Sequence, residues 1–256
     1  MGEKDEDGKR QGHWNFFYDN GDTLSYGEYG DNQAEGEWHF FYEDGQLEEI
    51  SNWSKGIVNG PIVKYHPNGN KMAEGEYEND DETGLWTYWD SDGIKEKSGT
   101  YAFGRRDGQW FWWYANRQLK EETFFSDSLR HGKSVVYHEN GQKMKEGSFV
   151  QNSQDGEWKF WYKNGNLQDQ SNWSYGKPHG KSTAYYESGQ LKFEGQYKDG
   201  NETGNHIWYY ENGQKEMEGN YSLGKQNGEF TYYFDNGEIR NVLVYEMGVL
   251  QENKIN

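Results

Sequence analysis

A glycine recurs every 24 residues along this chain of 256 residues, without an interruption. A fixed period of this length is typical of stacked supersecondary units and not of a single enclosed core. The period therefore predicts an array of about ten repeats, from Gly12 to about residue 251. The glycines that define it are Gly12, Gly36, Gly60, Gly84, Gly108, Gly132, Gly156, Gly180, Gly204 and Gly228.

A second glycine, nine residues after the first, predicts the structure of each repeat. It follows Asn, Asp or Ser, as in Asn20-Gly21, in every repeat except the one with Asn116-Arg117. Because Asn-Gly and Asp-Gly tolerate positive φ angles, we predict a two-residue type I′ turn within a β-hairpin. This register places Trp14 opposite Gly27, where the ring can cover the glycine backbone. At Arg117 we expect a strained or altered turn.

Strand alternation distributes the aromatic side chains over two faces of the predicted sheet. One face carries Trp14, Phe16, Tyr18, Tyr29 and their equivalents, which we expect to pack as ladders. The other face is mostly polar, and it holds one further aromatic column with no evident core to enter. We therefore take this column, called here the aromatic stripe, as the candidate partner-binding site. It consists of Phe17, Phe41, Tyr65, Trp89, Trp113, Tyr137, Trp161, Tyr185, Tyr209 and Tyr233.

These patterns predict an all-β fold: an elongated, single-layer, twisted antiparallel β-meander of about ten 24-residue hairpin repeats. The pattern of residues 37–54, which begins with Glu37-Trp38 and ends with Ser51-Asn52-Trp53-Ser54, recurs at residues 157–174, a shift of five repeats. We therefore expect one continuous repeat domain built from a duplicated five-repeat block, in which a site in one block has a counterpart in the other. The expected parts are an acidic N-terminal lead-in (1–11), repeats 1–5 (12–131), repeats 6–10 (132–251) and a C-terminal tail (252–256).

Composition and charge narrow the classes of partner. Hydrophobic residues make up 32% of the chain and aromatic residues 18%, so few aliphatic side chains remain to fill an enclosed core. The net charge of −18 argues against nucleic acid and anionic membranes as partners, and it suits a basic protein. The Met1–Asp5 segment lacks the apolar stretch of a signal peptide, so a cytoplasmic location is expected, with a trimmed or exported form left open.

No group of residues predicts catalysis, a metal site or a cofactor. The seven histidines show no metal-ligand spacing, and the chain has no cysteine. The acidic segment from Glu3 to Gly8 resembles a calcium loop, but Trp14 occupies the twelfth position, which requires a bidentate Glu. The glycines lie at turns and form no phosphate-binding loop. We therefore expect a protein that is not an enzyme, with no catalytic residues, metal or cofactor.

The repeat pattern resembles MORN-type repeats, and most of all the bacterial variant often described as the antitoxin or immunity half of toxin pairs. The resemblance covers nearly all of the chain and implies an extended antiparallel sheet that serves as a scaffold or partner-binding platform. Departures at Gly60-Pro61-Ile62, Arg117 and His206 are expected to alter the ladder locally. The residues that carry the match include Gly156-Glu157-Trp158, Trp161-Tyr162, Asn164-Gly165, Leu167 and Gly224-Lys225 with Gly228.

Three functions remain open on the sequence. The preferred one is a non-enzymatic platform that binds another protein, with a basic toxin as one candidate, through the aromatic stripe and the acidic surface. The second is a self-assembling structural protein that pairs through edge strands near residues 12–18 and 239–247. The candidate self-association edge is Val242, Leu243, Val244 and Tyr245. The third is a binder of cell-wall glycan or choline, because tandem aromatic hairpin repeats also occur in cell-wall-binding arrays.

Overall fold

The computed structural model describes residues 2–254, so Met1 and the last two residues of the expected C-terminal tail lie outside the described range. The chain consists of two compact units, one up to Leu129 and one from Arg130 on. This division lies close to the expected end of the fifth repeat at residue 131. That the two blocks form one continuous domain stays a prediction.

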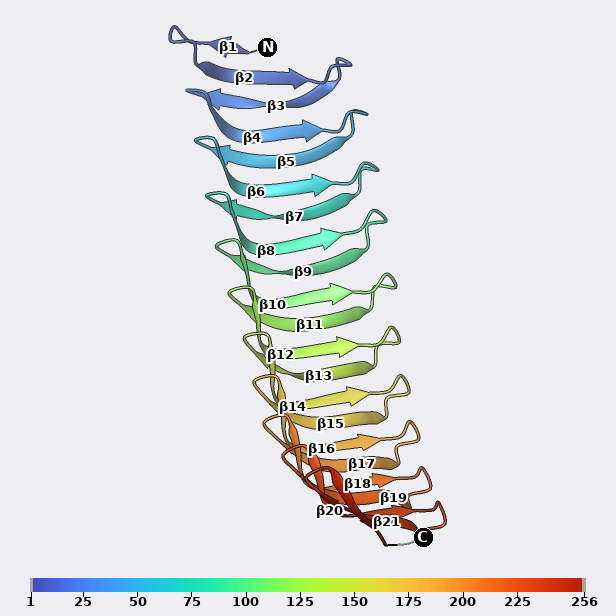
Figure 1. Cartoon of the computed structure of the whole chain (residues 1–256). Coiled ribbons are helices and arrows are strands. Elements are labelled where there is room, and N and C mark those ends of the chain that lie inside the picture. Colours follow the sequence, from blue (N-terminus) through green and yellow to red (C-terminus); the bar gives the residue numbers. More distant parts are fainter. Residues whose placement is uncertain (1, 255–256) are drawn as a thin grey trace. The chain divides into compact units, whose positions relative to one another are not determined.

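In the first unit every strand pairs antiparallel with the next strand along the chain, which gives a meander in one layer (Figure 1). Its strands are β1 (Glu3–Lys4), β2 (Arg10–Phe17), β3 (Thr23–Gly30), β4 (Gln33–Phe41), β5 (Leu47–Ser54), β6 (Ile57–Tyr65), β7 (Lys71–Glu78), β8 (Asp81–Trp89), β9 (Lys95–Ala102), β10 (Arg105–Trp113) and β11 (Leu119–Ser126).

The second unit repeats this architecture. Its strands are β12 (Leu129–Tyr137), β13 (Lys143–Val150), β14 (Ser153–Trp161), β15 (Leu167–Ser174), β16 (Lys177–Tyr185), β17 (Leu191–Lys198), β18 (Asn201–Tyr209), β19 (Lys215–Ser222), β20 (Lys225–Tyr233), β21 (Ile239–Glu246) and β22 (Val249–Asn253). Residues 2–254 contain no helix, and hence none long and apolar enough to cross a membrane. The predicted all-β fold of antiparallel hairpin repeats is confirmed.

The loops at the Asn-Gly positions differ from the predicted two-residue type I′ turn. Gly21 N donates to Tyr18 O at 3.0 Å, and Tyr18 N donates to Asp22 O at 2.8 Å, so residues 19–21 form a three-residue loop. Gly21 has a φ of 93°, whereas Asn20 is not among the left-handed residues. This is a type I turn followed by a glycine bulge, so the two-residue turn was wrong.

The predicted register is nevertheless correct, and Trp14 lies opposite Gly27. A second irregularity compensates for the longer loop. Phe16 pairs with Ser25 but Phe17 pairs with Thr23, so Leu24 is an extra residue on β3. The glycine bulge and the Leu24 bulge together restore the pairing that a two-residue turn would give.

Type I′ turns do occur, but at the opposite strand ends, where one hairpin is linked to the next. Gly30 pairs with Gln33, and the two residues between them, Asp31 and Asn32, have φ angles of 51° and 68°. Asn and Asp are favoured in such turns because they tolerate this conformation. Phe103, with a φ of 52°, takes the first position of one such turn although its side chain is 82% exposed.

The 24-residue glycine marks a bulge between consecutive hairpins. Tyr26 pairs with His39 and Glu28 pairs with Glu35, so one residue of β3 lies opposite three residues of β4. Gly36 lies in this bulge with a φ of 66°, and all ten glycines of the period have positive φ. An L-residue with a side chain is disfavoured in this conformation. The 24-residue glycine period therefore reflects the left-handed backbone that this bulge requires in each repeat.

The main packing contact places a large ring from one repeat over a glycine of the preceding repeat. A Cβ atom added to Gly27 would lie 2.3 Å from Trp38 Cδ2, and Trp38 is only 4% exposed. Trp38 Nε1 also donates to Glu28 O at 3.2 Å. We expected the Trp14 ring to cover Gly27, and this was wrong, because the ring that covers Gly27 is Trp38. The same contact joins Gly75 to Trp86, Gly99 to Trp110, Gly147 to Trp158 and Gly219 to Phe230.

The predicted self-association edge does not lie at an edge. Val242 to Tyr245 belong to β21, which pairs with β20 on one side and with β22 on the other. Lys254 N extends the second ladder by donating to Val242 O at 2.9 Å. The strand β22 was missed because residues 249–253 run across the expected end of the tenth repeat at residue 251 and contain no aromatic residue.

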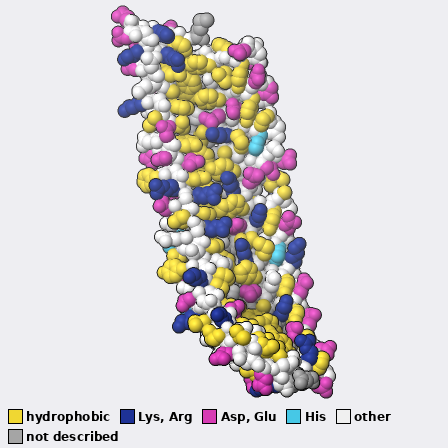
Figure 2. All heavy atoms as spheres, in the orientation of Figure 1, with side chains coloured by type: hydrophobic (Ala, Val, Ile, Leu, Met, Phe, Trp, Pro, Cys, Tyr) yellow, Lys and Arg dark blue, Asp and Glu magenta, His cyan; other side chains and the backbone are white. Residues whose placement is uncertain are grey.

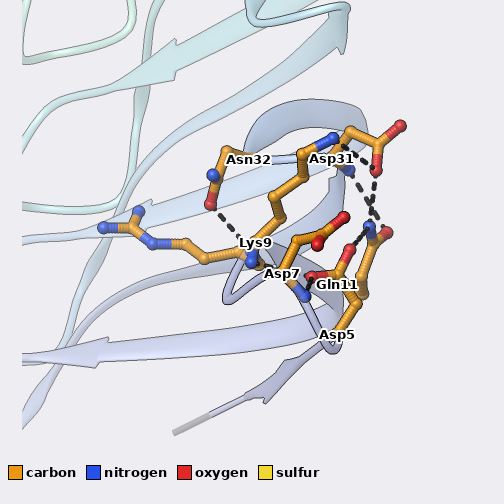
Figure 3. Close-up of polar contacts among 7 residues, drawn as sticks. Asp5, Asp7, Lys9, Gln11, Asp31 and Asn32 are labelled. Carbon is orange, nitrogen blue, oxygen red and sulfur yellow. Dashed lines mark hydrogen bonds and ion pairs between the residues drawn. The ribbon is translucent and has the colours of Figure 1, made fainter.

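The acidic N-terminal lead-in is a hairpin that is tied to the first linking turn (Figure 3). Gln11 Nε2 donates to Asp5 Oδ2 at 3.0 Å and to Asp31 Oδ1 at 2.8 Å, and Arg10 N donates to Asn32 Oδ1 at 2.7 Å. The hydrogen bond from Gln11 lowers the pKa of the Asp5 carboxyl. Within residues 2–254 no three metal-ligating side chains gather at one point.

We predict that Gly99→Ala destabilises the protein. Gly99 has no left-handed φ, so the cost comes from the new Cβ atom, which would lie 2.3 Å from Trp110, a side chain with 0% exposure. Overpacking of this kind costs about 1–3 kcal/mol. Urea unfolding of the full chain measures it, with Ser98→Ala, a neighbouring buried change that adds no atoms, as the control. Equal stability of Gly99→Ala and wild type would contradict the packing described.

A second prediction concerns Arg117, where we expected a strained or altered turn. The turn is unaltered, because Arg117 N donates to Tyr114 O at 2.8 Å and Arg117 has a φ of 69°. Arg117→Gly is expected to stabilise the chain by about 0.5–1 kcal/mol, since relief of the left-handed strain exceeds the entropy cost of glycine. The reciprocal change Gly93→Arg is expected to destabilise it by about 1 kcal/mol in the same urea experiment.

Candidate partner-binding surfaces

Each residue of the aromatic stripe is the last residue of an even-numbered strand, next to an Asn-Gly loop. The first unit contains Phe17, Phe41, Tyr65, Trp89 and Trp113, and the second contains Tyr137, Trp161, Tyr185, Tyr209 and Tyr233. Each pairs with the first residue of the following strand, as in Phe41 with Leu47 and Tyr65 with Lys71. In each unit the fold therefore aligns these residues at one end of the strands.

The stripe is a packed column in which rings alternate with lysine or aliphatic side chains. Lys95 Nζ lies 4.4 Å from the ring centroid of Trp113, and Lys143 Nζ lies 5.5 Å from that of Trp161. Cation–π contacts at exposed sites contribute about 0.5–1 kcal/mol each. The sequence analysis missed this packing, although the signal was present: the residue six positions after most stripe residues is Leu, Ile or Lys.

A hydrogen-bond ladder fixes the backbone of the stripe. Tyr42 OH donates to Tyr65 O at 2.7 Å, and Tyr186 OH donates to Tyr209 O at 2.7 Å. Histidine replaces tyrosine at two rungs, where His66 Nε2 lies 2.9 Å from Trp89 O and His138 Nε2 lies 3.0 Å from Trp161 O. These bonds run from one hairpin to the next on the face that carries the buried rings. They hold the backbone carbonyl groups of the stripe residues, whose own rings project from the other face.

The two faces differ in how accessible their rings are. No stripe residue is buried, and Phe17 is 55% exposed. In contrast, Trp110, Trp158 and Phe230 of the opposite face are at most 1% exposed. In Figure 2, hydrophobic side chains gather over the middle of the strands on the face in view, and acidic side chains are frequent along the strand ends of each unit.

One part of the stripe is hollowed. A cavity of about 310 Å³ lies between Trp89 and Trp113 and is also lined by Ile94, Lys95 and Arg117. Arg117 is the residue that replaces the usual turn glycine. Its guanidinium and the Lys95 ammonium make this hollow cationic, in contrast to the net charge of the chain.

Carboxylates flank the stripe in the second unit. Tyr209 OH donates to Glu194 Oε1 at 2.8 Å, and Tyr233 OH donates to Glu218 Oε1 at 2.6 Å. Burial, together with these hydrogen bonds, raises the pKa of each tyrosine to about 12. Burial alone would raise the pKa of Glu218, but hydrogen bonds from Lys215 and Tyr233 outweigh it and lower that pKa.

Two further hollows lie on the opposite face, one in each unit. The first, of about 310 Å³, is lined by Trp53, and the second, of about 370 Å³, by Trp173. Both tryptophans donate from Nε1 to a serine Oγ, Trp53 to Ser51 at 3.0 Å and Trp173 to Ser171 at 3.1 Å. Sequence reasoning expected each site to occur in both blocks but did not single out these tryptophans. The two hollows are not counterparts, because the residues 120 positions before Pro178, Ser182 and Tyr197 do not line the first one.

We predict that stability falls at high pH through the stripe tyrosines. Because their pKa values are raised to about 12, the folded state favours the neutral phenol. The stabilisation that the two neutral phenols give the folded state is fully present below about pH 10, and it is lost as the pH rises toward 12. Tyr209→Phe combined with Tyr233→Phe is expected to reduce the fall in unfolding free energy between these pH values, measured by urea titration at each pH. An unchanged fall would contradict the two hydrogen bonds.

No curated protein sequence matches the chain. Among solved structures, the crystal structure of TcdB2-TccC3 has a TM-score of 0.22 and 12% identity, over 94% of this chain and 15% of that chain. A Tc holotoxin pore from Photorhabdus luminescens has a TM-score of 0.21 and 12% identity, again over 15% of that chain. The chain spans only a small part of these proteins, and scores this low carry no argument about function.

The family model for the "MORN repeat variant" matches eight segments that together cover more than half of the chain. The repeats that contain Gly12 and Gly84 are not among them. The matched segments are residues 34–55, 58–79, 106–127, 130–151, 154–175, 178–199, 202–222 and 226–247. The chain therefore belongs to the MORN repeat variant family.

Proposed function

We propose that this protein is a non-enzymatic platform that binds another protein through the aromatic stripe. MORN repeats suggest a repeat-based role in binding or scaffolding. The observation that carries the proposal is the difference between the faces: stripe rings remain partly exposed, whereas Trp86, Trp110 and Trp158 on the other face are at most 2% exposed. Aromatic anchors surrounded by polar residues are typical of protein interfaces.

The rigidity of the stripe supports the same proposal. The Tyr42–Tyr65 and Tyr186–Tyr209 hydrogen bonds hold the backbone of the stripe residues, and a Lys or Leu lies opposite stripe residues such as Tyr65 and Tyr185. A surface ordered before binding loses less conformational entropy when the partner arrives. Within each unit the rings follow one another at two-strand intervals of about 10 Å, which suits a partner that contacts several repeats.

The charge of the chain favours a basic partner. Its net charge is −18, and glutamates such as Glu194 and Glu218 lie beside the stripe. The cationic hollow at Lys95 and Arg117 is a local exception and suits a carboxylate of the same partner. A small basic toxin as the partner would make the protein an immunity protein, which is the narrower form of the proposal.

Self-assembly is a second candidate, and one observation favours it. Every residue of β22 is exposed, with Val249 at 62% and Leu250 at 52%. A strand with an unpaired side can template pairing with another copy of the chain. The self-association edge is therefore proposed at β22 in place of residues 242–245.

The first experiment is mass photometry of the protein purified gently from its native source, with mass spectrometry of what accompanies it. A companion at constant stoichiometry supports the platform, and a basic companion supports the narrower form. Masses at multiples of the 30.1 kDa chain, with no companion, support self-assembly. In that case Leu250→Lys is expected to abolish the multiples, because a charge at the edge opposes pairing.

We predict that Trp89→Ala, Trp113→Ala and Trp161→Ala, combined in one chain, weaken binding of the companion by about 2 kcal/mol or more, as expected for central aromatic anchors. Isothermal titration calorimetry measures the affinity. Phe103→Ala combined with Tyr175→Ala is the matched control, because these rings are 82% and 74% exposed and lie on linking turns outside the stripe. Unaltered binding by the triple variant, or an equal loss in the control, would exclude the stripe as the site.

A further inference from the structure

We propose that the hollow at Trp173 binds a primary ammonium group, supplied by a lysine side chain of the partner protein. The identity of the supplier rests on the proposed function. The affinity of the hollow for an alkylammonium does not, because it is a property of this chain alone.

The hollow exists because a ring is missing from the buried face. Ser182 occupies the position that holds Trp38, Trp86, Trp110 or Trp158 in other repeats. It pairs directly with Ser171, so two small side chains face each other where other repeats place a ring over a glycine. The result is a cavity of about 370 Å³. Its lining includes Ser171 and Ser182 and the aromatic residues Phe160, Trp173 and Tyr197.

The hollow also contains a carboxylate with no cation beside it. Asp169 lines the cavity, and its Oδ1 atom accepts a hydrogen bond from Ser171 Oγ at 2.8 Å. Within residues 2–254 no cationic side chain forms an ion pair with Asp169, and burial raises the pKa of its carboxyl against the effect of Ser171. A half-buried carboxylate is destabilised without a counter-charge. An ammonium that enters the cavity would supply one.

The first unit shows what the second unit lacks. Glu49, the residue 120 positions before Asp169, forms an ion pair with Lys64, with Lys64 Nζ 3.2 Å from Glu49 Oε2. Lys64 lies directly opposite Glu49, and Ala184 lies in the same position opposite Asp169. Ile62, which is 3% exposed, occupies the place of Ser182. The first unit thus supplies its own ammonium, whereas the second leaves both the carboxylate and the adjacent volume open.

This comparison decides which cation fits. The group that satisfies Glu49 is a primary ammonium on an alkyl chain, so the same chemistry is assigned to the Asp169 hollow. The aromatic walls suit it, because the faces of Trp, Tyr and Phe attract cations, and the methylene groups of a lysine pack against apolar surface. Phe160, Trp173 and Tyr197 can thus hold the stem and the head group while Asp169 binds the charge.

The test is a titration of the full ¹⁵N-labelled chain, followed through the indole N–H signals of its tryptophans by NMR. The Trp173 signal is identified by its loss in Trp173→Phe. The probe is Nα-acetyl-lysine N-methylamide, and Nα-acetyl-norleucine N-methylamide is its neutral counterpart. We expect a saturable shift of the Trp173 signal with the lysine probe, at least tenfold weaker binding of the norleucine probe, and little change at Trp53.

Three variants distinguish the contribution of the cavity volume to binding from the contribution of the Asp169 charge. Asp169→Asn keeps the shape and is expected to weaken binding at least tenfold. Ala184→Lys places an ammonium opposite Asp169, as Lys64 does opposite Glu49, and Ser182→Ile fills the volume as Ile62 does. Both are expected to abolish the saturable shift. The urea unfolding midpoint of each variant confirms that it is folded.

The proposal is overturned if the wild type shows no saturable shift, if Asp169→Asn binds as tightly as wild type, or if the norleucine probe binds as well as the lysine probe. Tighter binding of tetramethylammonium than of the lysine probe would overturn the assignment to lysine in favour of a quaternary ammonium. Binding of the lysine probe in a protein that has no protein companion would leave the cavity assignment standing and remove the proposed function.

Discussion

The contact between a ring of one repeat and the backbone glycine of the preceding repeat is the interaction on which both units depend. A single-layer sheet has no second layer to enclose a core, so burial must come from neighbouring strands. Trp110 reaches 0% exposure in this way, because Gly99 lets the indole lie against the main chain and Tyr101 packs against it with 5.0 Å between ring centroids. Each repeat is thus stabilised mainly by the repeat beside it, as in other repeat proteins.

This arrangement leaves the stripe face free of any role in enclosing a core, which is why rings can stay accessible there. The stripe still contributes to stability, since Lys95 caps Trp113 and the tyrosine ladder fixes the carbonyls beside it. In the proposed function, stability and recognition use the same residues on this face. A ring held between a lysine and a hydrogen-bonded backbone is ordered without being buried, and that combination suits an interface anchor.

The sequence predicted the period, the hairpins and the register, because each depends on glycine at positions that need left-handed backbone or close approach. It did not predict the turn type. Asn20-Gly21 is compatible with both a two-residue type I′ turn and a three-residue loop with a glycine bulge, and the compensating bulge at Leu24 has no marker in the alternation. It placed Trp14 opposite Gly27 correctly, but pairing within a hairpin does not reveal that Trp38 of the next hairpin is the ring in contact. The Asp169 hollow required knowledge of which residues pair across strands, and so could not be recognised from spacing alone.

Nearest-neighbour stabilisation also explains how such a hollow can be tolerated. Loss of a buried tryptophan from an enclosed core typically costs about 3–5 kcal/mol, because the surrounding side chains cannot close the space. In the second unit Ser182 occupies the position of such a tryptophan, and Trp158 of the preceding repeat remains only 1% exposed. The first unit closes the equivalent position with Ile62 and the Glu49–Lys64 ion pair. A repeat array can therefore pair a carboxylate with its own lysine in one block and leave the counterpart carboxylate open to a hollow in the other, by exchanging only a few side chains on a fixed backbone.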